Sequence, residues 1–139
     1  IRNIDNILVF KKFMQLCALR IGSTLNIAAI ASDCGITANT VKSWLALLET
    51  SFILFRLASY HDNLGKRITK SPKLYFYDVG LATTLMGLDE ENLSKNRDLY
   101  GGLFENMIIV DFIKNFNAQN LRPTLTFYRD SNQKEVDLI

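Results

Sequence analysis

The chain has 139 residues, enough for one domain or two small ones. Hydrophobic residues make up 48% and charged residues 22%, which are ordinary globular values and exclude a disordered chain. The net charge of +2 is too small to indicate nucleic-acid binding by itself. No apolar run approaches the roughly 20 residues that a membrane helix needs, and no secretory signal is found, so we expect a cytoplasmic protein without a membrane partner.

Apolar periodicity and turn residues predict five elements in the first part of the chain. These are a helix from Asp5 to Ile21, a helix over 27–33, a helix over 38–48 capped by Thr37, and strands over 53–60 and 73–77 separated by a polar loop over 61–72. Cys17 and Cys34 lie among apolar residues at helical spacing, which predicts buried free thiols. A Cys/His zinc site is excluded because the chain has no CxxC motif and only one histidine, His61.

The same signals in the remaining chain predict a helix, a linker, a long helix and a hairpin. The expected ranges are a helix over 79–86 capped by Asp78, a linker over 89–97, a helix over 98–116, a strand over 125–128, a turn over 129–134 and a strand over 135–139. Charge also divides the chain in two. Residues 1–87 carry 10 basic against 5 acidic side chains, whereas residues 88–139 carry 6 against 9.

The clearest motif is a helix-turn-helix over residues 27–45. Two helices cross closely only where side chains are small, and Ala31 supplies such a residue in the first helix. Gly35 provides the positive φ of a tight turn, and Val41 packs the second helix back on the first. This spacing of small, glycine and β-branched residues is typical of helix-turn-helix units.

Five outward positions at the start of the third helix can reach base edges or phosphates: Ala38, Asn39, Thr40, Lys42 and Ser43. The loop between the two predicted strands resembles a wing and carries four cations for phosphate contacts: Lys66, Arg67, Lys70 and Lys73. Two alternatives stay open, because the unit can be a protein-interaction module and the loop cations can form a solvated basic surface.

The stretches KSPKLYFYDVGL, GGLFENMIIVDF and FYRDSNQKEVDLI, together with the helix-turn-helix, resemble the C-terminal region of a prokaryotic family of predicted AAA-type ATPases. The resemblance implies a winged helix at 1–87, followed at 88–139 by the first part of a restriction-endonuclease-like α/β unit. We therefore expect an α+β fragment of a longer chain. An upstream ATPase module would bind ATP and Mg²⁺ and would be a partner of this fragment, which has no P-loop motif of its own.

The final stretches are similar to the PD-(D/E)XK nuclease fold, in which acids hold a divalent metal and a lysine positions the attacking water. The resemblance places Glu105 as the helix acid and Asp137 as the strand acid, with a third acid and the lysine expected beyond Ile139. Alternatively, Glu105 faces a cation such as Arg129, and Asp137 is a solvated charge at a strand edge.

Two carboxylates make a poor Mg²⁺ site, so we expect this fragment to be non-catalytic, with no metal or cofactor of its own. The parent is expected to be an ATPase. The favoured hypothesis is a nucleic-acid-binding module, with DNA as its partner. The alternatives are a regulatory module of the ATPase and part of a metal-dependent nuclease.

Overall fold

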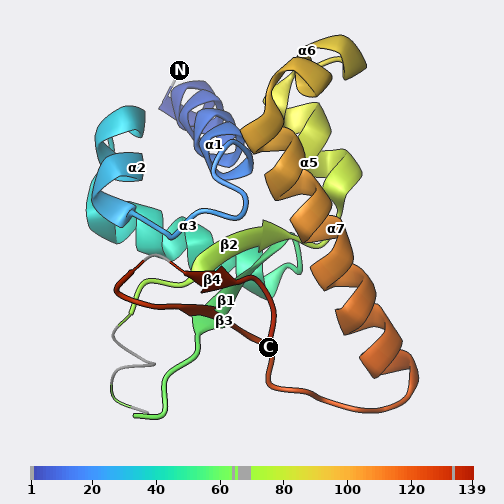
Figure 1. The fold of residues 1–139 in the computed structure, drawn as a ribbon. Coiled ribbons are helices and arrows are strands. Elements are labelled where there is room, and N and C mark those ends of the chain that lie inside the picture. Colours follow the sequence, from blue (N-terminus) through green and yellow to red (C-terminus); the bar gives the residue numbers. More distant parts are fainter. Residues whose placement is uncertain (1, 64, 66–69, 133) are drawn as a thin grey trace.

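The computed structural model describes residues 2–63, 65, 70–132 and 134–139, with the side chains of residues 2–5 left out, and shows a mixed α+β fold. Helices lie above a small curled sheet and along one side of it (Figure 1). The elements are α1 (Arg2–Ala18), α2 (Ile27–Cys34), α3 (Ala38–Thr50), β1 (Leu54–Ser59), β2 (Lys73–Phe76), α5 (Val79–Met86), α6 (Glu90–Lys95), α7 (Arg97–Ala118), β3 (Thr126–Arg129) and β4 (Glu135–Val136). The predicted α+β class is therefore confirmed.

The turn between α2 and α3 forms as the sequence predicts. Gly35 ends α2 with a φ of 67°, and the Thr37 hydroxyl caps α3 by accepting a hydrogen bond from the backbone N–H of Thr40. Val41 is fully buried beneath this turn. The first helix, predicted from Asp5 to Ile21, begins and ends earlier, because α1 spans Arg2–Ala18.

The sheet has the strand order β2-β1-β3-β4. β1 pairs antiparallel with β2 and parallel with β3, and β3 pairs antiparallel with the two-residue β4. On its other side, the start of β2 meets the segment before α2. The backbone N–H of Leu25 donates to the carbonyl of Pro72, and the N–H of Gly22 donates to the carbonyl of Leu74. The sheet thus contains strands from both predicted units, 1–87 and 88–139.

One hydrophobic core runs through the described residues and includes side chains from both halves of the chain. Phe13 of α1, Tyr75 of β2, Ile109 of α7 and Phe127 of β3 are among its largest buried members. The predicted buried cysteines are confirmed as free thiols. Burial and the neighbouring Cys34 raise the pKa of Cys17 to about 12, so its thiol stays protonated at neutral pH.

Two residues that the sequence does not single out attach α7 to the rest of the molecule. The fully buried Asn106 amide accepts a hydrogen bond of 2.8 Å from the backbone N–H of Phe76 and donates one of 2.7 Å to its carbonyl. Four residues earlier, a Cβ added to Gly102 would lie 2.8 Å from the carbonyl oxygen of Ile21. Gly102 therefore permits the close approach of α7 to the backbone at Ile21, and Asn106 fixes the position of α7 along β2.

Replacing Asn106 by alanine should lower the free energy of unfolding by about 1–3 kcal/mol, because both backbone groups of Phe76 lose their buried partner. Urea unfolding followed by circular dichroism measures the change. Asn117→Ala is the matched control, since Asn117 is exposed on the same helix, and it should stay within about 0.5 kcal/mol of wild type. Equal effects of the two substitutions would contradict the role of Asn106.

Candidate functional site

A buried lysine is the centre of the most highly charged site among the described residues. Lys73 lies at the start of β2 with only 3% of its side chain exposed. Its Nζ atom lies 3.1 Å from Oε1 of Glu105 and 3.1 Å from Oδ1 of Asp137, and it also contacts Oε1 of Glu135. We call these four residues, together with Tyr75, the Lys73 cluster.

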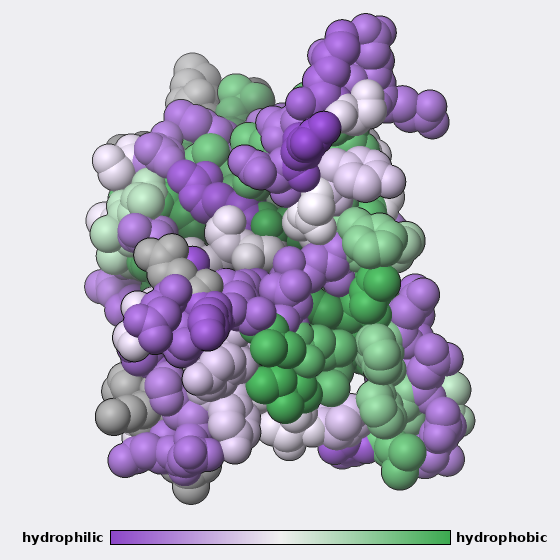
Figure 2. All heavy atoms as spheres, in the orientation of Figure 1, coloured by the Kyte–Doolittle hydropathy of each residue, from purple (hydrophilic) through white to green (hydrophobic). Residues whose placement is uncertain are grey.

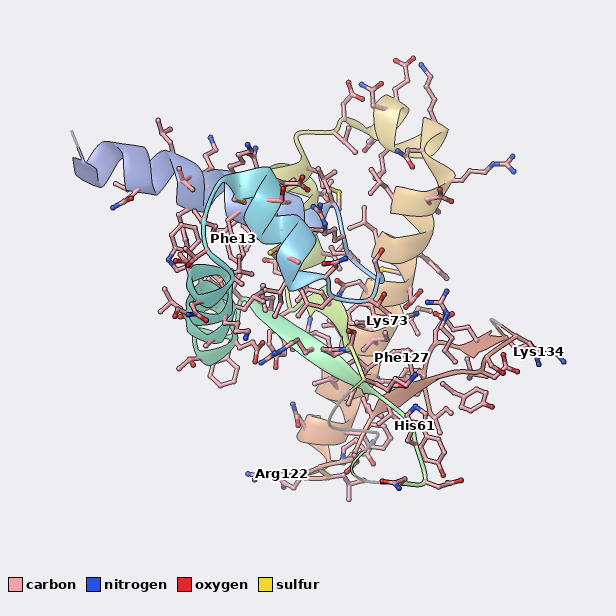
Figure 3. The ribbon with its side chains drawn as sticks, turned by 90° about the vertical axis from the view of Figure 1, so that its left-hand side faces the viewer. Phe13, His61, Lys73, Arg122, Phe127 and Lys134 are labelled. Carbon is pink, nitrogen blue, oxygen red and sulfur yellow. The ribbon has the colours of Figure 1, made fainter. Side chains whose placement is uncertain are left out.

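Three elements that are far apart in sequence build this cluster. Lys73 and Tyr75 are two residues apart on β2 and therefore share one face of the strand. That face meets α7, where Oε1 of Glu105 accepts hydrogen bonds from the Lys73 ammonium and from the Tyr75 hydroxyl. β4 supplies Glu135, and Asp137 follows directly after that strand. Figure 3 shows Lys73 pointing toward the end of the sheet where Phe127 lies.

The Phe127 ring of β3 covers one side of the Lys73 ammonium. The Lys73 ammonium lies 5.2 Å from the centroid of the Phe127 ring, a distance at which the face of a ring attracts a cation. A second cation stands further out, since Nε of Arg129 lies 3.3 Å from Oε2 of Glu135. Two cations thus oppose three carboxylates, and the cluster keeps a net negative charge.

The cluster holds its protons tightly. Burial lowers the pKa of Lys73, but hydrogen bonds and charges from the three carboxylates outweigh burial and raise the pKa above the ordinary lysine value. Burial and the adjacent Glu105 carboxylate raise the pKa of the Tyr75 hydroxyl. At neutral pH the lysine is therefore an ammonium and the tyrosine a neutral phenol, so neither side chain can act as a base.

The structure brings together the two acids that the nuclease resemblance points to. Glu105 and Asp137 bind the same ammonium, and Glu135 joins them as a third acid. Within the described ranges, no three His, Cys, Asp or Glu side chains are arranged to hold a metal ion. The carboxylates are organised around Lys73 instead. The alternative pairing of Glu105 with Arg129 does not occur, because Arg129 binds Glu135.

Lys73 needs a correction. We expected it to be a wing cation available to phosphates, but its ammonium is buried among carboxylates, because the side chain at the first position of β2 points toward α7. The sequence contains a signal for this placement. Lys73 belongs to an otherwise apolar and aromatic strand, and its side chain lies on the same face of the strand as that of Tyr75. A charged side chain on such a face needs buried partners of opposite charge. Glu135 was not singled out at all.

The other predicted nucleic-acid residues lie elsewhere. On α3, Asn39, Lys42 and Ser43 are exposed. Thr40 is half-buried, with its hydroxyl 2.9 Å from that of Thr37. Lys70 is exposed ahead of β2. The remaining two wing cations, Lys66 and Arg67, lie outside the described residues.

Replacing Lys73 by methionine keeps most of the side-chain length but leaves three carboxylates without their shared cation. We expect the free energy of unfolding at neutral pH to fall by about 3 kcal/mol, the lower end of the range for breaking a buried ion pair. The lower end applies because the Asp137 side chain is 58% exposed. Urea unfolding measures the loss, and the exposed Lys70→Met is the control. Similar stabilities for the two variants would contradict the buried cluster.

The raised pKa values predict a loss of stability in alkali. Lys73 and Tyr75 have ordinary pKa values of 10.5 and 10.0, and both are higher in the folded chain. Their contribution to stability is therefore complete below about pH 10 and is lost as the pH rises through the folded-state values. The urea midpoint of the wild type should fall above this pH, and Lys73→Met should show a smaller fall. Parallel pH curves for both proteins would refute the assignment.

Comparison with known proteins finds matches to the models of two families of unknown function. Residues 1–92 match the model of the family described as Domain of unknown function (DUF8612), and residues 100–139 match that of Domain of unknown function (DUF4143). Uncharacterized protein Rv2008c of Mycobacterium tuberculosis and Uncharacterized protein Mb2031c of Mycobacterium bovis are each 26% identical to this chain over 118 residues.

These aligned residues cover 84% of the chain but only 26% of each mycobacterial protein, so the chain spans about a quarter of the length of these relatives. No solved structure matches it. Among the described residues, no helix has the length and apolar character required to cross a membrane. The first family model covers well over half of the 139 residues, and the chain therefore belongs to the DUF8612 family.

Proposed function

We propose that this chain is a non-catalytic, nucleic-acid-binding winged-helix module from the C-terminal region of an AAA-type ATPase. The observation that carries the proposal is the surface at the start of α3. This helix follows a tight turn at Gly35 and exposes Asn39, Lys42 and Ser43 together on its first turns. A helix presented in this way can enter the major groove, where amide and ammonium groups reach base edges and phosphates.

The arrangement around α3 supports the winged-helix assignment. The antiparallel pair of β1 and β2 follows α3 directly, and the segment before α2 adds backbone hydrogen bonds along β2. The loop between the strands is the proposed wing and includes the exposed Lys70. Cations on such a loop release counterions when they meet a phosphate backbone.

Two observations support a place beside an ATPase module. The family that residues 100–139 match is often found C-terminal to AAA ATPase domains. The mycobacterial relatives are also about four times as long as the aligned segment, which leaves room for a module that binds ATP and Mg²⁺. The convergence of Glu105 and Asp137 supports a nuclease-like origin of the second part. The Lys73 ammonium between them supports a structural role for these acids in this fragment.

A protein-interaction module of the ATPase is the second candidate, and one surface favours it. α7 leaves four large apolar side chains exposed: Phe104, Met107, Ile108 and Phe112. Figure 2 shows hydrophobic residues gathered on the side of the molecule where α7 lies. Contiguous exposed apolar surface of this kind is typical of protein contacts. This candidate predicts no DNA binding at physiological salt.

Fluorescence anisotropy with a labelled DNA duplex, at several salt concentrations, tests the proposal. Wild-type protein should bind weakly, and its affinity should fall steeply as salt rises. Lys42→Ala, and Lys66→Ala combined with Arg67→Ala, should lower the affinity and reduce the slope of log K against log salt by about 1 for each phosphate that the variant no longer neutralises. Lys114→Ala on α7 is the control and should leave both quantities unchanged.

Two results would reject the nucleic-acid function. One is an absence of duplex binding by the wild type even at low salt. The other is an equal loss of affinity in Lys114→Ala and Lys42→Ala, because it would show that only net charge matters and that α3 has no specific role.

A further inference from the structure

We propose that the cleft between the end of β1 and the β3–β4 turn binds one unpaired nucleotide of a single-stranded nucleic acid. The inference rests on the proposed nucleic-acid function and gives that function a second site, separate from α3. The cleft has a volume of about 670 Å³, within the range of about 300–1,000 Å³ typical of small-ligand pockets. We call it the β1–β3 cleft, after the two parallel strands beside it.

Aromatic side chains line the β1–β3 cleft on two elements. Tyr60 and His61 follow β1, and Phe127 and Tyr128 belong to β3. Phe127 is almost completely buried, whereas Tyr128 is 38% exposed and available to a ligand. Figure 3 shows His61 below Phe127, which lies next to Lys73. The exposed Tyr128 ring can stack on an unpaired base of any sequence.

Cations and hydroxyl groups stand beside the rings. Lys70 and Arg129 line the cleft together with Thr24, Ser71 and Ser131. The Arg129 guanidinium is held in place by Glu135, whose Oε2 lies 3.3 Å from its Nε. A planar guanidinium that is already oriented loses little freedom on binding a phosphate. The cleft therefore combines a stacking surface with groups that bind a sugar–phosphate backbone.

The two acids that line the cleft are engaged within the protein. Oδ1 of Asp130 accepts backbone hydrogen bonds of 2.8 Å from Asn132 and from Lys134, which closes the β3–β4 turn. Oδ1 of Asp62 accepts a hydrogen bond of 2.8 Å from the Tyr60 hydroxyl. The hydrogen bond to Asp62 also orients the Tyr60 ring. An incoming phosphate meets the exposed Lys70 first, next to Arg129, which is oriented by its ion pair with Glu135.

The chemistry favours a single strand over a duplex. In a duplex the bases are stacked and paired, so their faces are not available to a protein ring without unstacking. A single strand presents both a free base and a phosphate to one cleft. The α3 surface, in contrast, exposes polar side chains suited to a groove.

Anisotropy with labelled (dT)10 and with a labelled duplex separates the two sites. We expect wild-type protein to bind (dT)10, and Tyr128→Leu to weaken this binding by about 5- to 150-fold, the range for losing one base–ring stack. Tyr128→Phe keeps the ring and should retain the affinity. Duplex binding should be unchanged in both variants. Tyr100→Leu is the control, because Tyr100 is exposed on α7 outside the cleft.

Lys70→Gln provides a second variant that does not alter the sheet, and it should also weaken (dT)10 binding. Duplex binding without any (dT)10 binding would overturn the β1–β3 cleft while leaving the proposed α3 function intact. Binding of (dT)10 that disappears in Tyr128→Leu, without any duplex binding, would support the cleft and reject the α3 mode. An affinity for thymidine monophosphate well above that for (dT)10 would overturn the assignment to a strand, because it would show that the cleft holds a free nucleotide.

Discussion

The buried ammonium of Lys73 is the interaction on which the arrangement of the second half of the chain depends. It joins β2 to α7 through Glu105, and to β4 and its continuation through Glu135 and Asp137. An unpaired charge in this position would cost several kcal/mol. The packing of β2 against α7 and β4 therefore stabilises the buried Lys73 ammonium, because α7 and the β4 end of the hairpin supply its carboxylate partners. Asn106 reinforces the same junction with two backbone hydrogen bonds.

This junction also bears on the chemistry of the site. Carboxylates that converge on an empty space attract a metal ion, whereas carboxylates that converge on an ammonium are already neutralised in part. The proton on Lys73 is held by the charges that surround it, so the cluster stabilises the fold at neutral pH and its lysine does not act as a base. The three carboxylates therefore have a structural role around Lys73.

Three surfaces outside the Lys73 cluster are the candidates for binding. The α3 surface offers amide, hydroxyl and ammonium groups suited to a groove, and the β1–β3 cleft offers rings with neighbouring cations. The exposed apolar face of α7 is a third surface, suited to protein contacts. Arg129 connects the Lys73 cluster with the β1–β3 cleft, because it binds Glu135 and also lines the cleft. Loss of the cluster would thus release one of the proposed phosphate-binding side chains.

Local signals in the sequence determined the elements and their caps. Gly35, Thr37 and Asp78 act on neighbouring backbone through φ preference and short-range hydrogen bonds, so their roles could be predicted. The acids of the site, Glu105 and Asp137, could also be named, but only through resemblance. Tertiary structure alone decided the partner of these acids, the parallel pairing of β1 with β3 and the Asn106 bridge. Each of these joins residues that are far apart in the sequence, and no local pattern records which distant side chain will neutralise a buried charge.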